Sequence, residues 1–484
     1  TITGADGVTL NGNITTADVA DNNVEITGGV TLGAAVTIDT AGTNSDGTIT
    51  FNNTIDGAQD LDLVSDDAAI VITGAIGANT ALGSLDINQA EGVGNINLGN
   101  IGADVDTPGV TGVTRIGNAN TANLNLNGTV YSTGGITSFA AADDTINISS
   151  SSPIFTVSND EITFIGNVSL AKSLTVKSNG GIIDFSGSIS GSSEGSSDGV
   201  IDLNSNAPDN VSSTTQKVTI TKIGGNNQIY QLKITADDGI NLKNDITTSQ
   251  KVDNSITFNG PILLSSENIK IKTFDGQISF NSTLDSSENV NSNLSIEAGS
   301  GSISISGAIG STSTLGQINI ENALTLSMPS LVKSEGFSSN DFTISGSPRE
   351  GSYTGSSANV TRDLISEGFV IYGPINNKYS VVDSELTISD LLQESNNIIK
   401  TELNYEIEKV DFNWGSGYRL LIDKDLISSN LSDIGNYSDL ESKQLNVGKV
   451  LNLGNSNLLN SKNLNQVNYT DLVSHYPESK SFTF

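Results

Sequence analysis

The stretch Ile183-Asp184-Phe185-Ser186-Gly187-Ser188-Ile189 alternates apolar and small polar residues around one glycine. Variants of this phrase return along the chain at intervals of roughly 20 to 30 residues, a spacing typical of stacked repeats. The other copies begin at Ile49, Ile70, Leu124, Ile162, Ile256, Ile278 and Ile303. Alternation with a period of two predicts β-strands, so the repeat unit is expected to be built from strands.

The alternation also predicts which side chains face inward. Ile183, Phe185 and Ile189 share one face, and the polar residues between them share the other. Gly187 is expected to supply a bend, because glycine tolerates backbone angles that other residues avoid. A shorter phrase such as Leu61-Asp62-Leu63 follows many copies. One repeat therefore holds two or three short strands separated by bends, which is one coil of a β-helix.

A single coil cannot be stable by itself. About five buried apolar side chains contribute roughly 2 kcal/mol each, whereas ordering the backbone costs about 1 to 2 kcal/mol per residue. Each coil must pair its backbone with its neighbours and cover their interiors. We therefore predict an all-β fold, a β-helix or β-solenoid.

The predicted solenoid spans residues 1–361. Two segments with little periodicity, 104–121 and 191–215, are expected to be lateral loops. The second loop is interrupted by the strand-like Val200-Ile201-Asp202-Leu203. A Ser- and Gly-rich stretch then precedes residues 362–484, where longer side chains enter and the repeat is lost. This C-terminal module is predicted to cap the stack or to dock a neighbouring subunit.

Two alternatives stay open inside the C-terminal module. Residues 384–401 place apolar side chains near one face of a helix, although a strand fits as well. Residues 401–414 alternate like a strand, and together with the last residues of the chain they are candidates for donation to a neighbour's sheet.

Composition narrows the function. Asp and Glu number 54 against 22 Lys and Arg, which gives a net charge of −32. Such a surface repels nucleic acid and anionic lipid, so neither is an expected partner. There is no cysteine, and no apolar run is long enough for a transmembrane helix. The chain begins at Thr1 without Met or a signal segment, and we expect it to be a processed product.

Residues 47–87 and 180–190 resemble the repeats of filamentous-haemagglutinin-like and autotransporter-passenger-like bacterial surface proteins. The resemblance covers about residues 1 to 330. It implies a right-handed parallel β-helix, secretion, and a role in adhesion or in surface fibres. It implies no catalytic residue.

Candidate chemistry is sparse. The one histidine, His475, is expected to be an ordinary packed or solvated side chain. The carboxylate pairs Asp66-Asp67, Asp143-Asp144 and Asp237-Asp238 would suit a β-helical polysaccharide lyase or hydrolase. Each pair is expected at a turn, however, where Asp is common, and no basic cluster precedes any pair. We therefore predict that the chain is not an enzyme, with no catalytic, cofactor-binding or metal-binding residue.

Two binding hypotheses accompany that prediction. Asp and Asn oxygens at bends suit calcium, although no EF-hand or calcium-binding nonapeptide is present, so solvated bends are the simpler interpretation. Trp414, Tyr418 and Arg419 group aromatic and cationic side chains. They suit a sugar platform or the packing of the C-terminal module, and packing is favoured.

The sequence thus predicts a structural extracellular protein at a bacterial cell surface. We expect a subunit of a filament or sheath, a homopolymer joined by end-to-end coil contacts and by strand donation. The alternative is a monomeric adhesin stalk whose lateral loops bind host or surface glycans.

Overall fold

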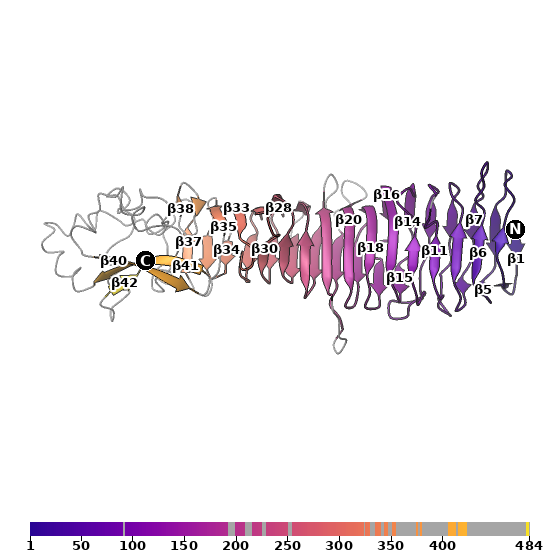
Figure 1. The fold of residues 1–484 in the computed structure, drawn as a ribbon, viewed down its shortest axis with the longest axis horizontal. Helices are drawn as coiled ribbons and strands as arrows, with labels where there is room; N and C mark the ends of the chain where they lie inside the picture. The colour runs from indigo at the N-terminus through magenta and orange to yellow at the C-terminus, as the bar shows by residue number, and fades with distance from the viewer. Residues whose placement is uncertain are drawn as a thin grey trace. The chain divides into compact units, whose positions relative to one another are not determined.

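A computed structural model describes residues 1–90, 92–191, 199–208, 215–224, 229–249 and 254–323. Beyond these it describes shorter segments, chiefly the backbones of strands. The chain divides into two compact units, Thr1–Ile262 and Leu263–Phe484. The described residues form strands joined by turns and bends, with no α-helix among them (Figure 1).

Unit 1 is a stack of parallel strands. Its largest set of paired strands consists of β1 (Ile2–Thr3), β3 (Ile14–Thr15), β4 (Val24–Thr27), β6 (Val36–Asp39), β7 (Ile49–Phe51), β9 (Leu61–Val64), β10 (Ile70–Ile72), β11 (Leu85–Ile87), β12 (Ile96–Leu98), β13 (Thr114–Ile116), β14 (Asn123–Leu126), β16 (Thr137–Ile148), β18 (Ile162–Leu170), β20 (Ile182–Gly191), β22 (Lys217–Ile223), β24 (Gly239–Leu242) and β25 (Ile246–Thr247).

The remaining strands of unit 1 form two further sets. These are β2 (Val8–Leu10), β5 (Val30–Leu32) and β8 (Ile55–Asp56), and then β15 (Val130–Thr133), β17 (Ile154–Val157), β19 (Leu174–Lys177), β21 (Val200–Asn204), β23 (Gln231–Thr235) and β26 (Ser255–Asn259).

Equivalent residues of successive coils lie directly above one another. Ile70 of β10 pairs in parallel register with Ile49 of β7 on one side and Ile96 of β12 on the other. The column continues from Ile96 to Leu124 of β14. A parallel ladder in this register places like positions together, and all four residues of this column are buried. The prediction of an all-β, stacked β-solenoid is confirmed.

The interior of the central coils is an aromatic stack. Tyr131 and Phe155 stack with ring centroids 4.4 Å apart, and Phe164 and Phe185 stack at 4.5 Å. The two stacks meet edge to face, with the centroids of Phe155 and Phe164 at 5.3 Å. These rings are fully buried, and such contacts add to the stabilisation that comes from the buried area alone. The predicted inward face of Phe185 is confirmed.

Gly187 is needed for a different reason from the predicted one. Its φ is not in the left-handed region, which Gly166 one coil earlier does occupy, at 121°. A Cβ on Gly187 would lie 2.2 Å from the carbonyl oxygen of Gly166. Glycine therefore allows two coils to approach at this corner, where any side chain would collide with the neighbouring backbone.

The lateral loops differ in part from expectation. Within 104–121, bends occupy much of the segment up to residue 112, and β13 then adds a rung in register with β11. Within 191–215, the expected strand is present as β21, which pairs with β19 and β23. The rest of that segment lies largely outside the described residues.

Unit 2 begins with the same parallel pattern. Its strands are β28 (Asn268–Lys272), β29 (Gln277–Phe280), β30 (Leu284–Ser286), β31 (Asn293–Glu297), β32 (Ser302–Ile305), β33 (Leu315–Asn322), β34 (Thr325–Met328), β35 (Ser334–Ser339), β36 (Thr343–Gly346), β37 (Gly351–Thr354), β38 (Pro374–Ile375), β39 (Lys378–Tyr379), β40 (Tyr405–Phe412), β41 (Gly415–Asp423) and β42 (Ser481–Thr483), and β27 (Ile262–Leu264) lies at the unit boundary.

Pairing in unit 2 changes from parallel to antiparallel after β36. β37 pairs with β36 in the antiparallel sense, and β41 pairs antiparallel with both β40 and β42. The predicted strand in 401–414 and the chain end thus pair with β41 of the same chain. The boundary at residue 361 and the helix proposed for 384–401 lie outside the described residues, so both stay predictions.

Replacing Phe185 by Asp is expected to destabilise the central coils by at least about 3 to 5 kcal/mol, because it removes a buried ring and buries an unpaired charge. Thermal melting and hydrogen exchange along β18 and β20 would measure the loss. Ser190→Asp, which adds the same charge on the outward face of β20, is the matched control and should melt like the wild type. Equal melting of the two variants would show that the inward face is wrongly assigned.

Candidate functional site

The pair Asp237-Asp238 lies in a turn, as expected. Asp237 accepts a hydrogen bond from Asn206 Nδ2 at 2.7 Å, and Asp238 accepts one from the backbone N–H of Gln216 at 2.7 Å. Both carboxylates therefore hold neighbouring segments together, which is a structural use of the pair.

The other two pairs differ from each other. Asp66 and Asp67 also lie in a turn, with Asp66 at a φ of 45°, and Asp67 accepts a hydrogen bond from Val93 N–H at 3.4 Å. Asp143 and Asp144, by contrast, lie within β16, where its register with β18 shifts. The expected turn at this pair is therefore wrong, because an irregular strand accommodates the extra residues.

Acidic residues also stack along the outer face. Asp62 of β9 pairs in register with Asp86 of β11, and Asp86 pairs with Arg115 of β13. Arg115 forms an exposed ion pair with Asp86 at 3.4 Å. Partial burial, and then the charges of Asp86 and Asp39, raise the pKa of Asp62. This column is a site of local electrostatic strain, partly relieved by Arg115.

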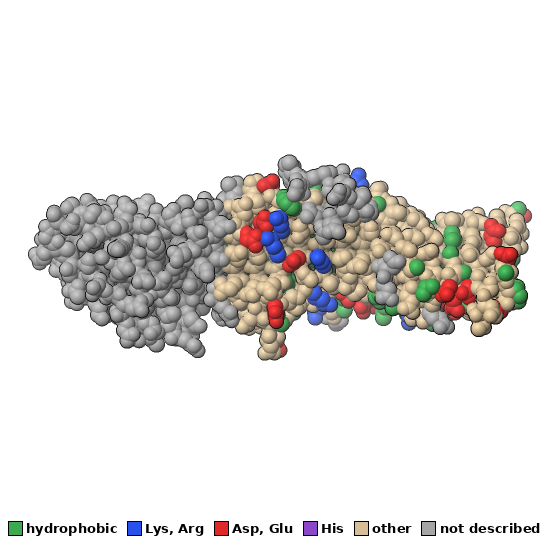
Figure 2. All heavy atoms as spheres, turned by 90° about the horizontal axis from the view of Figure 1, so that it is seen from above, with side chains coloured by type: hydrophobic (Ala, Val, Ile, Leu, Met, Phe, Trp, Pro, Cys, Tyr) green, Lys and Arg blue, Asp and Glu red, His purple; other side chains and the backbone are tan. Residues whose placement is uncertain are grey.

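A second charged cluster lies in unit 2 and combines lysines of one coil with glutamates of the next two. Lys270 of β28 reaches Glu297 at 2.9 Å and Glu321 at 2.5 Å, and Lys272 contacts Glu297 at 2.8 Å. In Figure 2, Lys and Arg side chains lie beside Asp and Glu in this half of the described surface. The coils near the N-terminus show acidic groups alone on the same face, and residues 1–114 contain 15 Asp and Glu but no Lys or Arg.

The network in unit 2 shifts the pKa of its members. Burial raises the pKa of Glu297, but hydrogen bonds from Lys272 and Lys270 outweigh burial, so the pKa is lowered. Burial lowers the pKa of Lys270, but hydrogen bonds to Glu321 and Glu297 outweigh it, so the pKa is raised. Each charge therefore favours the ionised form of its partner.

Carboxylates at bends repeat one structural motif. Asp56 accepts hydrogen bonds from the backbone N–H groups of Asn79 at 2.8 Å and Thr80 at 3.1 Å. Asp285 does the same for Thr312 at 2.7 Å. In both cases an Asp of one coil fixes a loop of the next. The described residues contain no group of three or more acidic or His side chains placed to hold a metal ion.

Side-chain amides form a ladder on the outer face of unit 1. Asn147 Nδ2 donates to Asn125 Oδ1 at 3.0 Å, and Asn125 Nδ2 donates to Asn97 Oδ1 at 2.9 Å. The next position in the column is Val71. The ladder therefore ends at Asn97, whose own Nδ2 donates no hydrogen bond to any described residue.

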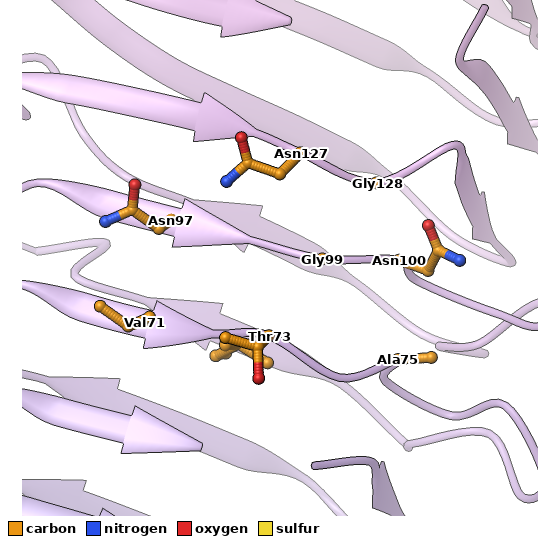
Figure 3. A pocket seen from close by; sticks show the side chains of 9 residues that line it. Val71, Thr73, Ala75, Asn97, Gly99, Asn100, Asn127 and Gly128 are labelled. Carbon is orange, nitrogen blue, oxygen red and sulfur yellow. The ribbon is translucent and has the colours of Figure 1, made fainter. Parts of the chain in front are cut away.

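The end of this ladder borders a groove of about 320 Å³. The groove, which we call the amide groove, lies where β10, β12 and β14 end (Figure 3). Its lining consists of Val71, Ile72, Thr73, Ala75, Asn97, Gly99, Asn100, Asn127 and Gly128. In Figure 3, Asn127 and Asn97 lie on neighbouring strands, with Val71, Thr73 and Ala75 along the next coil. No part of this groove was expected from the sequence.

The glycines of the amide groove allow neighbouring coils to approach each other closely. A Cβ on Gly99 would lie 2.8 Å from the carbonyl oxygen of Gly74, and one on Gly128 would lie 2.5 Å from Asn100 Oδ1. Asn100 Oδ1 in turn accepts the N–H of Thr129 at 2.7 Å. The corner is therefore fixed by backbone contacts between coils, and its shape is set before any ligand binds.

The remaining candidates lie where side chains are not described. His475 and Trp414 are outside the described residues, and Tyr418 and Arg419 are placed only as backbone of β41. The sugar platform thus stays a prediction. None of the described residues belongs to a helix that is apolar and long enough to span a membrane.

Comparison with known proteins adds no assignment: no family model, curated protein or solved structure matches the chain.

Replacing Asp62 by Asn is expected to stabilise unit 1 at pH 7 by about 0.5 kcal/mol, because it removes repulsion between stacked carboxylates at a half-exposed position. The folded-state pKa of Asp62 is raised, so its unfavourable contribution exists only while the carboxylate is ionised. The gain should disappear as the pH falls below about 4. Urea denaturation at both pH values would measure it. The exposed Asp6→Asn is the control, and a D62N chain no more stable than D6N would contradict the strain.

Glu297→Gln is expected to lower the free energy of unfolding by about 1 kcal/mol at pH 7, the opposite of the effect at Asp62. The folded-state pKa of Glu297 is lowered, so its stabilisation is present above the unfolded-state pKa and is lost as the pH falls through the folded-state value. Denaturation curves between pH 7 and pH 3 should converge for variant and wild type. Glu288→Gln, which removes an exposed charge, should change little at either pH; an equal loss in both variants would argue against the network.

Proposed function

We propose that the chain is a structural, non-enzymatic subunit of an extracellular filament or sheath on a bacterial cell. In this proposal coils of one copy stack on coils of the next, and the C-terminal module controls the junction. The observation that carries the proposal is the parallel ladder of unit 1, in which equivalent residues of successive coils pair in register.

The repeated register supports self-association on physical grounds. In the columns through Ile70 and Ile96, each interior residue meets an equivalent residue of the next coil. A coil of another copy can form the same backbone hydrogen bonds and bury the same apolar area, because each contact joins equivalent residues of two coils. A head-to-tail contact of this kind repeats without closing and produces a fibre. Repetitive bacterial surface proteins, which the repeats resemble, use such β-solenoids.

Charge supports a salt-dependent junction. Each copy carries −32 overall, and the first 114 residues carry only acidic side chains among their charged groups. Two such surfaces repel each other, and salt screens the repulsion over about 8 Å at physiological ionic strength. Assembly therefore requires the contact energy of stacked coils to exceed a repulsion that the solvent can weaken.

Fibre formation is expected to strengthen as salt or divalent cation concentration rises. Negative-stain microscopy and light scattering of the purified chain across a salt series would show longer fibres at higher ionic strength. A folded domain fused before Thr1 through a cleavable linker should block growth by covering one end of the stack, and cleavage should restore it.

Two results would overturn this function. Isolated short rods under all salt conditions would favour the alternative of a monomeric adhesin stalk. Fibres that dissociate in moderate salt would mean that attractive ion pairs, and not stacked coils, hold the junction. A fusion placed before Thr1 that leaves growth unchanged would exclude this end from the contact.

A further inference from the structure

We propose that the amide groove binds a neutral saccharide. The groove lies entirely within unit 1, and its lining contains no residue of the two segments predicted as lateral loops. The proposal is independent of filament assembly, because the lining comes from one copy of the chain.

Three amides lie in the lining of the groove, and in Figure 3 those of Asn97 and Asn100 point toward its opposite ends. Asn97 Oδ1 accepts from Asn125, Asn127 Oδ1 accepts from Ser149 Oγ at 2.7 Å, and Asn100 Oδ1 accepts from backbone N–H groups. Each oxygen is therefore fixed, which orients each amide. The three Nδ2 groups donate to no described residue and stay available for oxygen atoms of a ligand.

The rest of the lining fits the carbon skeleton of a sugar. Val71 and Ala75 present methyl groups, and Gly99 and Gly128 expose backbone. A saccharide combines hydroxyl oxygens, which pair with amides, and C–H faces, which pack on methyl groups. The volume of about 320 Å³ lies at the lower end of the range for small-molecule sites, so a short segment of a glycan is the appropriate size.

The charge of the surroundings selects against acidic sugars. None of the lining residues is charged, and no Lys or Arg occurs before Arg115. An anionic group in the groove would lose hydration without gaining a cation, on a chain of strongly negative net charge. The chemistry therefore favours uncharged hexoses or N-acetylhexosamines over uronates and sialates.

Saturation-transfer NMR on the full chain tests the site. The neutral probes are maltotriose, cellotriose, lactose, xylotriose and N,N′-diacetylchitobiose, and the acidic probe is trigalacturonate. We expect at least one neutral probe to bind with a dissociation constant on the order of 1 mM, and trigalacturonate to give no transfer.

The double variant Asn97→Asp, Asn127→Asp isolates the donors. Each Asp keeps the oxygen that Asn125 or Ser149 uses and loses only the free Nδ2, so the coil is expected to stay folded. Loss of two hydrogen bonds should weaken binding about tenfold or more. Asn95→Asp is the matched control, because its oxygen likewise accepts a hydrogen bond, from Asn123 Nδ2 at 3.2 Å, and it lies outside the lining of the groove. It should bind like the wild type.

Several outcomes would overturn the saccharide site. These are no transfer to any neutral probe, unchanged binding by the double variant, equal binding of trigalacturonate, or a loss in Asn95→Asp as large as in the double variant. Circular dichroism and melting of both variants confirm that a loss of binding is not a loss of fold. Fibre formation is scored separately, so failure of either proposal leaves the other measurable.

Discussion

Parallel backbone pairing between successive coils is the constraint on which the rest of the structure depends. Once Ile70 lies in register between Ile49 and Ile96, the alternation of the strand sends every second side chain inward. The interior is then a set of columns in which each residue meets its equivalents. The outer face is likewise a set of columns, so polar groups stack there whether they attract or repel. Asp62 on Asp86 is the unfavourable case, and the Lys270 network is the favourable one.

The same constraint explains how much of the fold the sequence could predict. The phrase at Ile183 repeats often enough to indicate strands, coils and an inward face, and the buried Phe185 agrees with this. The role of Gly187 could not be deduced, because the neighbouring carbonyl of Gly166 is one coil away and glycine satisfies several needs equally well. The run at Asp143-Asp144 looked like a turn because Asp favours turns, yet pairing on both sides of β16 kept it within a strand.

The candidate site could not be predicted from the sequence, for a related reason. Asn97 and Asn125 are 28 residues apart, whereas Asn125 and Asn147 are 22 apart. These three Asn residues form a ladder only because strand pairing aligns them. Coils of unequal length hide that alignment in the sequence. Single Asn residues in a chain rich in Asn carry no signal of their own. The sequence signals of a site are clusters of His, Cys or carboxylates. The groove has none of these, because amides, methyl groups and glycine backbone line it.

The reach of Lys270 has a consequence for how the solenoid responds to force or heat. Its ammonium group contacts Glu321, 51 residues away and two coils along the stack. Stacked repeats are commonly treated as units that interact only with their immediate neighbours. A contact that skips one coil joins three coils into a single cooperative block, since fraying of the outer coil removes a charge partner from the inner one. These three coils of unit 2 should therefore unfold together in one cooperative step. In a solenoid without such contacts, the coils would unfold one at a time.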